Sequence, residues 1–85
     1  MTQEKSSKWH FKAIKKGTLG ELSKIQEELD EAIDAHENNQ KVMMLYELCD
    51  IIGATEAVAQ KYYGLKLIDL IKFVEIKKHA MYGDN

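Results

Sequence analysis

Two pairs of acidic residues, placed symmetrically about a short polar segment, most constrain how this chain can fold. Glu28 and Glu31 form the first pair, and Glu47 and Asp50 form the second. Within each pair the spacing is i, i+3, so on a helix both carboxylates project from one face, about one turn apart. The segment between the pairs, ENNQK at 37–41, has two asparagines and no apolar residue, which is typical of a turn between two helices.

A reversal of the chain near Asn39 would bring the two pairs level with each other across antiparallel helices. Glu28 would then lie opposite Asp50. Glu31 would lie opposite Glu47, because each couple is equally distant from the turn. At 1.5 Å rise per residue, the two levels are about 12 and about 16 Å from the turn. Four carboxylates in one small volume cannot all stay ionised without a cation, so the pattern predicts a metal site.

Length and composition favour one small all-α domain. The chain has 85 residues, no proline and 31% charged residues, which suits helices joined by short connections. Apolar residues recur at helical spacing in three stretches, which predicts helices over about 18–36, 40–63 and 65–82. We expect antiparallel helical hairpins that assemble into a four-helix bundle shared between subunits.

Local signals predict where these helices begin and end. Thr18 and Glu21 have the spacing of a capping box and predict the start of the first long helix. Gly64 predicts the end of the next helix. The stripe expected to face the core from the first of these helices consists of Leu22, Ile25, Leu29 and Ala32/Ile33.

The apolar surface is larger than one short chain can bury. The helix over 40–63 is apolar nearly all round, and Glu47 and Asp50 interrupt that surface beside the small residues Ala54 and Ala57. The last helix has two apolar faces, one with Leu67, Ile68, Leu70, Ile71 and Val74 and the other with Phe73 and Ile76. We therefore expect a homodimer or homotetramer with a shared core.

The chain divides into a basic N-terminal segment, 1–17, and a helical domain, 18–85. In the first segment Ser6 or Ser7 could cap a short helix that ends at Gly17. One interpretation is an amphipathic segment that Trp9 pins to the domain. The other gives Trp9 and Phe11 a base-binding role, with the lysines attracting phosphates.

Charge and cysteine content exclude several classes of protein. A net charge of -2, a pI near 5.9 and the absence of arginine argue against a nucleic-acid binder. Cys49 is alone, so it forms no disulfide framework or thiolate metal cluster and is expected to be a small core residue. No apolar run is long enough for a membrane span or a signal peptide, and we expect a soluble, cytoplasmic protein.

Carboxylate ligands without cysteine suit Mg²⁺, or Mn²⁺, better than zinc. Because Mg²⁺ is commonly completed by substrate phosphates, the acidic site points to phosphate chemistry. Glu27 or Glu21 could orient an attacking water. The residues expected to neutralise the phosphates are Lys72, Lys77 and Lys78, on the last helix.

The motif E-E-x-x-E, followed after fifteen residues by E-x-x-D, resembles that of the MazG-like all-α nucleoside triphosphate pyrophosphohydrolases. It reads EELDE at 27–31 and ELCD at 47–50, and YYGLKLIDLIKFVEIKK at 62–78 is similar to the family's last two helices. The resemblance covers about 19–78. It implies Mg²⁺-dependent cleavage of a (d)NTP or related nucleotide to the monophosphate and pyrophosphate. The ligands that it implies are Glu28, Glu31, Glu47 and Asp50, with Glu27 and Glu28 as the catalytic carboxylates.

Three points stay open. Where the family's last helix commonly has an asparagine and arginines, this chain has Glu75, Lys77 and no arginine. The alternative function is a non-catalytic helical oligomerisation or regulatory module with a vestigial or structural cation site. Related proteins act on phosphoribosyl-ATP or on dUTP and dCTP, and the sequence does not separate these substrates.

Overall fold

The computed structural model describes residues 12–82, which form three α-helices and no strand. The helices are α2 (Leu22–Glu37), α3 (Lys41–Tyr63) and α4 (Leu67–Tyr82). The predicted all-α class is confirmed. The bundle shared between subunits stays a prediction.

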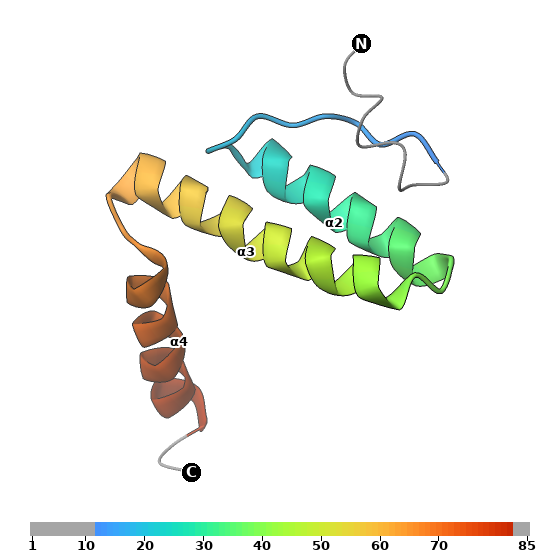
Figure 1. The fold of residues 1–85 in the computed structure, drawn as a ribbon. Helices are drawn as coiled ribbons and strands as arrows, with labels where there is room; N and C mark the ends of the chain where they lie inside the picture. The colour runs from blue at the N-terminus through green and yellow to red at the C-terminus, as the bar shows by residue number, and fades with distance from the viewer. Residues whose placement is uncertain (1–11, 83–85) are drawn as a thin grey trace.

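Helices α2 and α3 pack side by side and run in opposite directions, joined by a turn at 38–40 (Figure 1). Asn39 occupies the left-handed region with a φ of 59°, which asparagine tolerates better than most residues. The Asn38 amide donates to the Asp34 carbonyl at 3.2 Å, and the Gln40 amide donates to the Ala35 carbonyl at 2.8 Å. These bonds close the end of α2, so the predicted reversal at Asn39 is confirmed.

Gly64 ends α3, as predicted, and redirects the chain. Its φ is 67°, and its amide donates to the Gln60 carbonyl at 3.0 Å. After this glycine, α4 points away from the α2/α3 pair (Figure 1). Across residues 12–82, no helix combines the length and apolarity that crossing a bilayer requires.

The predicted capping box is wrong. Helix α2 begins at Leu22, and Glu21 precedes it in an extended conformation with no capping hydrogen bond from its side chain. Thr18 instead lies in a turn, where its carbonyl accepts from the Glu21 amide at 2.9 Å. The Glu21 carboxylate is drawn to α3, where it pairs with Lys61 and accepts a hydrogen bond from the Tyr62 hydroxyl.

The predicted core stripe of α2 is confirmed in the single chain only at Ala32, and it is wrong for the large side chains Leu22, Leu29 and Ile33. Leu22, Leu29 and Ile33 are 70%, 42% and 40% exposed. The buried apolar residues are small: Ala32 and Ala35 on α2, and Ala54 and Ala59 on α3. Small side chains let two helices approach closely, so α2 packs on α3 through its alanines and acidic residues. Cys49, expected in the core, is exposed.

Residues 12–20 contain no helix and run along α2 (Figure 1). Lys12 pairs with Glu37 at 3.2 Å near one end of α2, and the Gly17 amide donates to the Glu27 carboxylate at 2.9 Å. A Cβ at Gly17 would overlap the Ser23 carbonyl, so this close approach depends on glycine. The predicted short helix does not extend into this stretch. Its remainder, with Trp9 and Phe11, lies outside the described residues.

Candidate functional site

The carboxylates of the two motifs lie together between α2 and α3. Glu28, Glu47 and Asp50 each offer an oxygen within 4.8 Å of the others, and Glu27, Glu28 and Glu31 form a second such group. Glu28 belongs to both groups. The turn at 38–40 sets the register that brings the acidic residues of the two helices together.

This cluster is buried on one side and open on the other. Glu28, Glu31 and Glu47 are only 6%, 5% and 4% exposed, whereas Asp50 is exposed. Ionised carboxylates are rarely buried without a partner, because desolvation of the charge is costly. The cluster therefore needs protons or cations to offset its charge, and the Asp50 side gives solvent access to it.

Burial and mutual repulsion raise the pKa of several of these acids. Burial, together with hydrogen bonds to Glu47 and Glu28, raises the pKa of Glu31 to about 9, which favours the protonated form of Glu31 at neutral pH when no cation is bound. Burial also raises the pKa of Glu47, to about 7. The pKa of Asp50 is raised by burial and by the nearby charge of Glu28.

Glu27, which groups with Glu28 and Glu31, differs from the other acids because cations and an amide surround its carboxylate. Its Oε1 accepts from the Gly17 amide at 2.9 Å and from the Lys24 ammonium at 3.1 Å, and its Oε2 pairs with Lys16 at 3.2 Å. Burial alone would raise the pKa of Glu27, but these hydrogen bonds outweigh burial and hold the pKa below its usual value. Its contacts fix residues 16 and 17 to α2. A catalytic role for Glu27 stays a prediction.

Lys24 is a site residue that the sequence interpretation missed. Its ammonium lies 3.1 Å from Glu27 and 3.2 Å from Glu28, so it bridges the anchored carboxylate and the candidate metal ligand. Burial would lower the pKa of Lys24, but its ion pairs with the two glutamates raise the pKa above its usual value. The i, i+3 and i, i+4 spacings from Lys24 to Glu27 and Glu28 were the available signal.

Glu28 provides the most direct structural argument for a cation. Its Oε2 pairs with Lys24, but its Oε1 is buried and has no hydrogen-bond partner within residues 12–82. A buried carboxylate oxygen without a donor is costly unless something else satisfies it. The surrounding ligands are carboxylate oxygens, which hard divalent cations such as Mg²⁺ and Mn²⁺ prefer. The residues present therefore fit a divalent metal site.

The predicted phosphate-binding lysines do not join this cluster within one chain. Lys72, Lys77 and Lys78 are exposed on α4, which points away from the helix pair (Figure 1). Glu21, proposed as an alternative water-orienting residue, is engaged with Lys61 and Tyr62.

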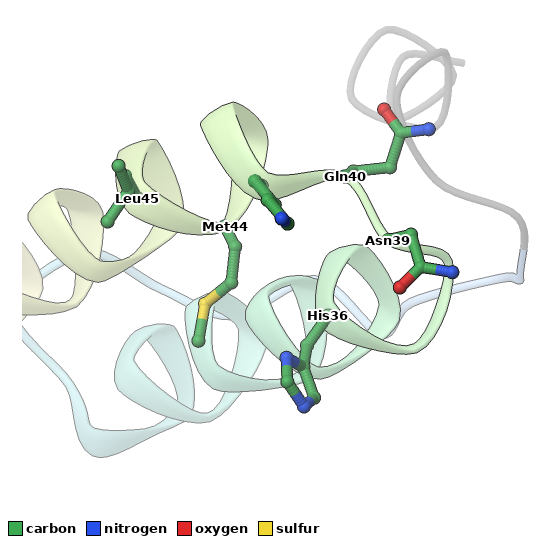
Figure 2. A pocket seen from close by; sticks show the side chains of 6 residues that line it. His36, Asn39, Gln40, Met44 and Leu45 are labelled. Carbon is green, nitrogen blue, oxygen red and sulfur yellow. The ribbon is translucent and has the colours of Figure 1, made fainter.

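A separate pocket lies at the turn between α2 and α3 (Figure 2). His36 and Met44 point toward the same space, one from each helix (Figure 2). The other lining residues are Asn39, Gln40, Lys41 and Leu45. None of the acidic motif residues lines it. His36 is exposed there, at a solvent edge rather than in the acidic cluster.

A comparison with protein families identifies a match over most of the chain. The family model described as phosphoribosyl-ATP pyrophosphohydrolase matches residues 2–78, which include all five acidic residues of the two motifs. No curated protein and no solved structure matches the chain at a significant level.

Proposed function

The chain belongs to the phosphoribosyl-ATP pyrophosphohydrolase family, and from this premise we propose that it is a Mg²⁺-dependent nucleotide pyrophosphohydrolase. It would cleave a (d)NTP or a related nucleotide, such as phosphoribosyl-ATP, to the monophosphate and pyrophosphate. The observation that carries the proposal is the cluster formed by the buried Glu28, Glu31 and Glu47 and the exposed Asp50, in which one Glu28 oxygen has no hydrogen-bond partner within the described residues.

The four motif residues would hold the metal, and Mn²⁺ could replace Mg²⁺. A bound divalent cation offsets charge on the phosphates and lowers the pKa of water, which favours attack on phosphorus. The burial of Glu28, Glu31 and Glu47 keeps these carboxylates in place and limits their contact with water. Asp50, at the exposed edge, would face the incoming nucleotide.

Glu27 contributes by holding its surroundings in position. Its contacts with Gly17, Lys16 and Lys24 keep it ionised and fix residues 16 and 17, and with them the segment 12–20, along α2. If Glu27 also orients the attacking water, as its place in the motif implies, it would do so as a carboxylate and not as a carboxylic acid.

The lysines of α4 would reach the substrate from another copy of the chain. Helix α4 exposes large apolar residues: Ile68, Ile71, Phe73, Val74, Ile76 and Met81 are 47–63% exposed. Large apolar residues exposed on both faces of a helix are typical of a subunit interface. A homodimer or homotetramer would cover this surface and could place Lys72, Lys77 and Lys78 beside an acidic cluster.

Pyrophosphate release from a panel of nucleotides, with Mg²⁺ or with EDTA, tests the proposal. The panel contains the (d)NTPs and phosphoribosyl-ATP. We expect release from at least one nucleotide, only when the metal is present. Glu47→Gln should lower the rate on the order of 100-fold, yet stay folded, because it removes a charge from a buried position.

Glu37→Gln is the matched control, because Glu37 lies on the same helix pair but is exposed and paired with Lys12. It should keep the wild-type rate. Normal turnover by Glu47→Gln would contradict the metal assignment. Absence of release from every nucleotide would favour the non-catalytic helical module.

A further inference from the structure

Lys24 links Glu28 of the acidic cluster to Glu27, the carboxylate that anchors residues 16 and 17. Its side chain is 25% exposed and lies in the first turn of α2, one turn before both of its partners. The ammonium is 3.2 Å from Glu28 Oε2, and Glu28 shares its cluster with Glu47 and Asp50. A positive charge therefore already lies at the edge of the space where a divalent cation would be bound.

Glu27 holds this ammonium in place. Its side chain is 1% exposed and lies 3.1 Å from Lys24 Nζ. Glu27 is also bonded to the Gly17 amide and paired with Lys16, so it has little freedom to move away. Lys24 would have to give up the Glu27 ion pair to leave the site, and a buried ion pair that loses one partner is strongly destabilised.

Two positive charges near one set of carboxylates compete. At separations of a few ångströms, and with partial burial, the repulsion between an ammonium and a divalent cation is large, because solvent screens it poorly. The same ammonium offsets the repulsion among the carboxylates when no cation is bound. Lys24 therefore stabilises the metal-free state of the site and destabilises the metal-bound state.

We propose that Lys24 is the resident counter-ion of the acidic site, stabilising the metal-free protein and weakening the binding of a divalent cation to Glu28, Glu47 and Asp50. This inference rests on the metal site of the proposed function. It adds a residue that tunes the affinity of that site, held in place by Glu27.

The test compares Mn²⁺ binding and metal-free stability in the full chain. Isothermal titration with MnCl₂ gives the affinity, and thermal unfolding in EDTA gives the stability. Lys24→Met retains most of the length and apolar bulk of the side chain without its charge. We expect it to bind Mn²⁺ about tenfold more tightly, or better, and to unfold at a lower temperature without metal. If Lys24 contributed only by packing, its replacement would lower both the Mn²⁺ affinity and the unfolding temperature.

Two further variants make the result specific. Lys16→Met removes a positive charge from the same Glu27 partner. Lys16 pairs with Glu27 Oε2, whereas Lys24 pairs with both Glu27 and Glu28, so Mn²⁺ affinity should change by less than about threefold. Lys24→Arg retains the charge and should stay within about threefold of wild type. If Lys24→Met does not fold, Lys24→Gln takes its place as the uncharged variant, and Lys24→Arg is the folded protein with which it is compared.

The outcomes separate this inference from the proposed function. If the wild-type chain binds no Mn²⁺, both the metal-dependent function and the inference are overturned. If the wild type binds Mn²⁺ but neither uncharged variant at position 24 binds it more tightly, only the inference is overturned. Tighter binding together with a lower metal-free unfolding temperature supports it.

Discussion

The burial of Glu31 makes the metal-free fold dependent on pH. Glu31 is 5% exposed, and burial with the hydrogen bond to Glu47 raises its pKa to about 9. In the unfolded chain a glutamate has a pKa of about 4.3. Between these values the folded protein binds more protons than the unfolded chain, so the free energy of unfolding decreases as pH rises. Glu47, with a pKa of about 7, adds to this slope in the lower part of the range.

We therefore expect the unfolding temperature in EDTA to fall steadily between about pH 5 and pH 9. Glu27 has a lowered pKa, so its own contribution is lost below about pH 4, outside this range. Glu31→Gln, which cannot titrate, should flatten the decline. Circular dichroism melts at intervals of one pH unit would measure it. A metal-free unfolding temperature that is constant across the range would contradict the burial of these carboxylates.

The grouping of the acidic residues in space could be predicted from their spacing, whereas their individual contacts could not. The mirrored pairs and the asparagine turn were sufficient to bring Glu28 and Glu47 together, because helical rise and a reversal at Asn39 determine register. Lys24 was missed although its i, i+3 and i, i+4 spacings to Glu27 and Glu28 were visible in the sequence. The Gly17 contact could not be predicted, because it depends on where residues 12–20 lie against α2, and no local periodicity encodes that path.

At the scale of the elements, the sequence signal for the end of a helix was more informative than the signal for the start of one. Gly64 ends α3 because only a residue that tolerates a positive φ can close the helix there, which is a local requirement. The Thr18 capping box failed because Glu21 found a cation and a hydroxyl on α3, which is a tertiary effect. Leu22 and Leu29 do lie at helical spacing in α2, but they are exposed and do not form the core between α2 and α3. Periodicity identifies a face but not what covers it.

Gly53, inside α3, and Gly64, at its C-terminal cap, should respond oppositely to replacement by alanine. At Gly64, with a φ of 67°, alanine should lower the free energy of unfolding by about 1 kcal/mol, because a Cβ is strained in the left-handed region. At Gly53, in the helix interior, a Cβ meets nothing within 4 Å, so alanine should raise it by about 0.5–1 kcal/mol. Urea unfolding of both variants would measure these changes. A destabilised Gly53→Ala would instead indicate that another copy packs against that position.

At the scale of the whole molecule, one chain leaves its apolar surface largely uncovered. The buried apolar residues of the described chain are four alanines, while seventeen large apolar residues are exposed. Four alanines cannot offset the conformational entropy lost by ordering three helices. Association would bury the face of α4 and the stripe of α2 together. This is the physical reason to expect a homo-oligomer and to look for the substrate lysines on a neighbouring copy.

If the lysines act on a neighbouring copy, two inactive variants should complement each other. Glu47→Gln lacks a complete acidic cluster, and the triple variant Lys72→Gln, Lys77→Gln, Lys78→Gln lacks the lysines. In a mixed dimer, one of the two sites would combine intact acids from one chain with intact lysines from the other. Equal mixing with subunit exchange should therefore restore about a quarter of the wild-type rate.

The measurement is pyrophosphate release before and after the two variants are mixed under conditions that allow subunits to exchange. Mixing Glu47→Gln with Glu28→Gln is the control, because both lose the same acidic cluster and no mixed site regains it. Light scattering on each variant confirms that it still associates. Since α4 points away from the acids of its own chain, failure to recover any activity in an associated, exchanging mixture would mean that these lysines do not bind the substrate of a neighbouring copy.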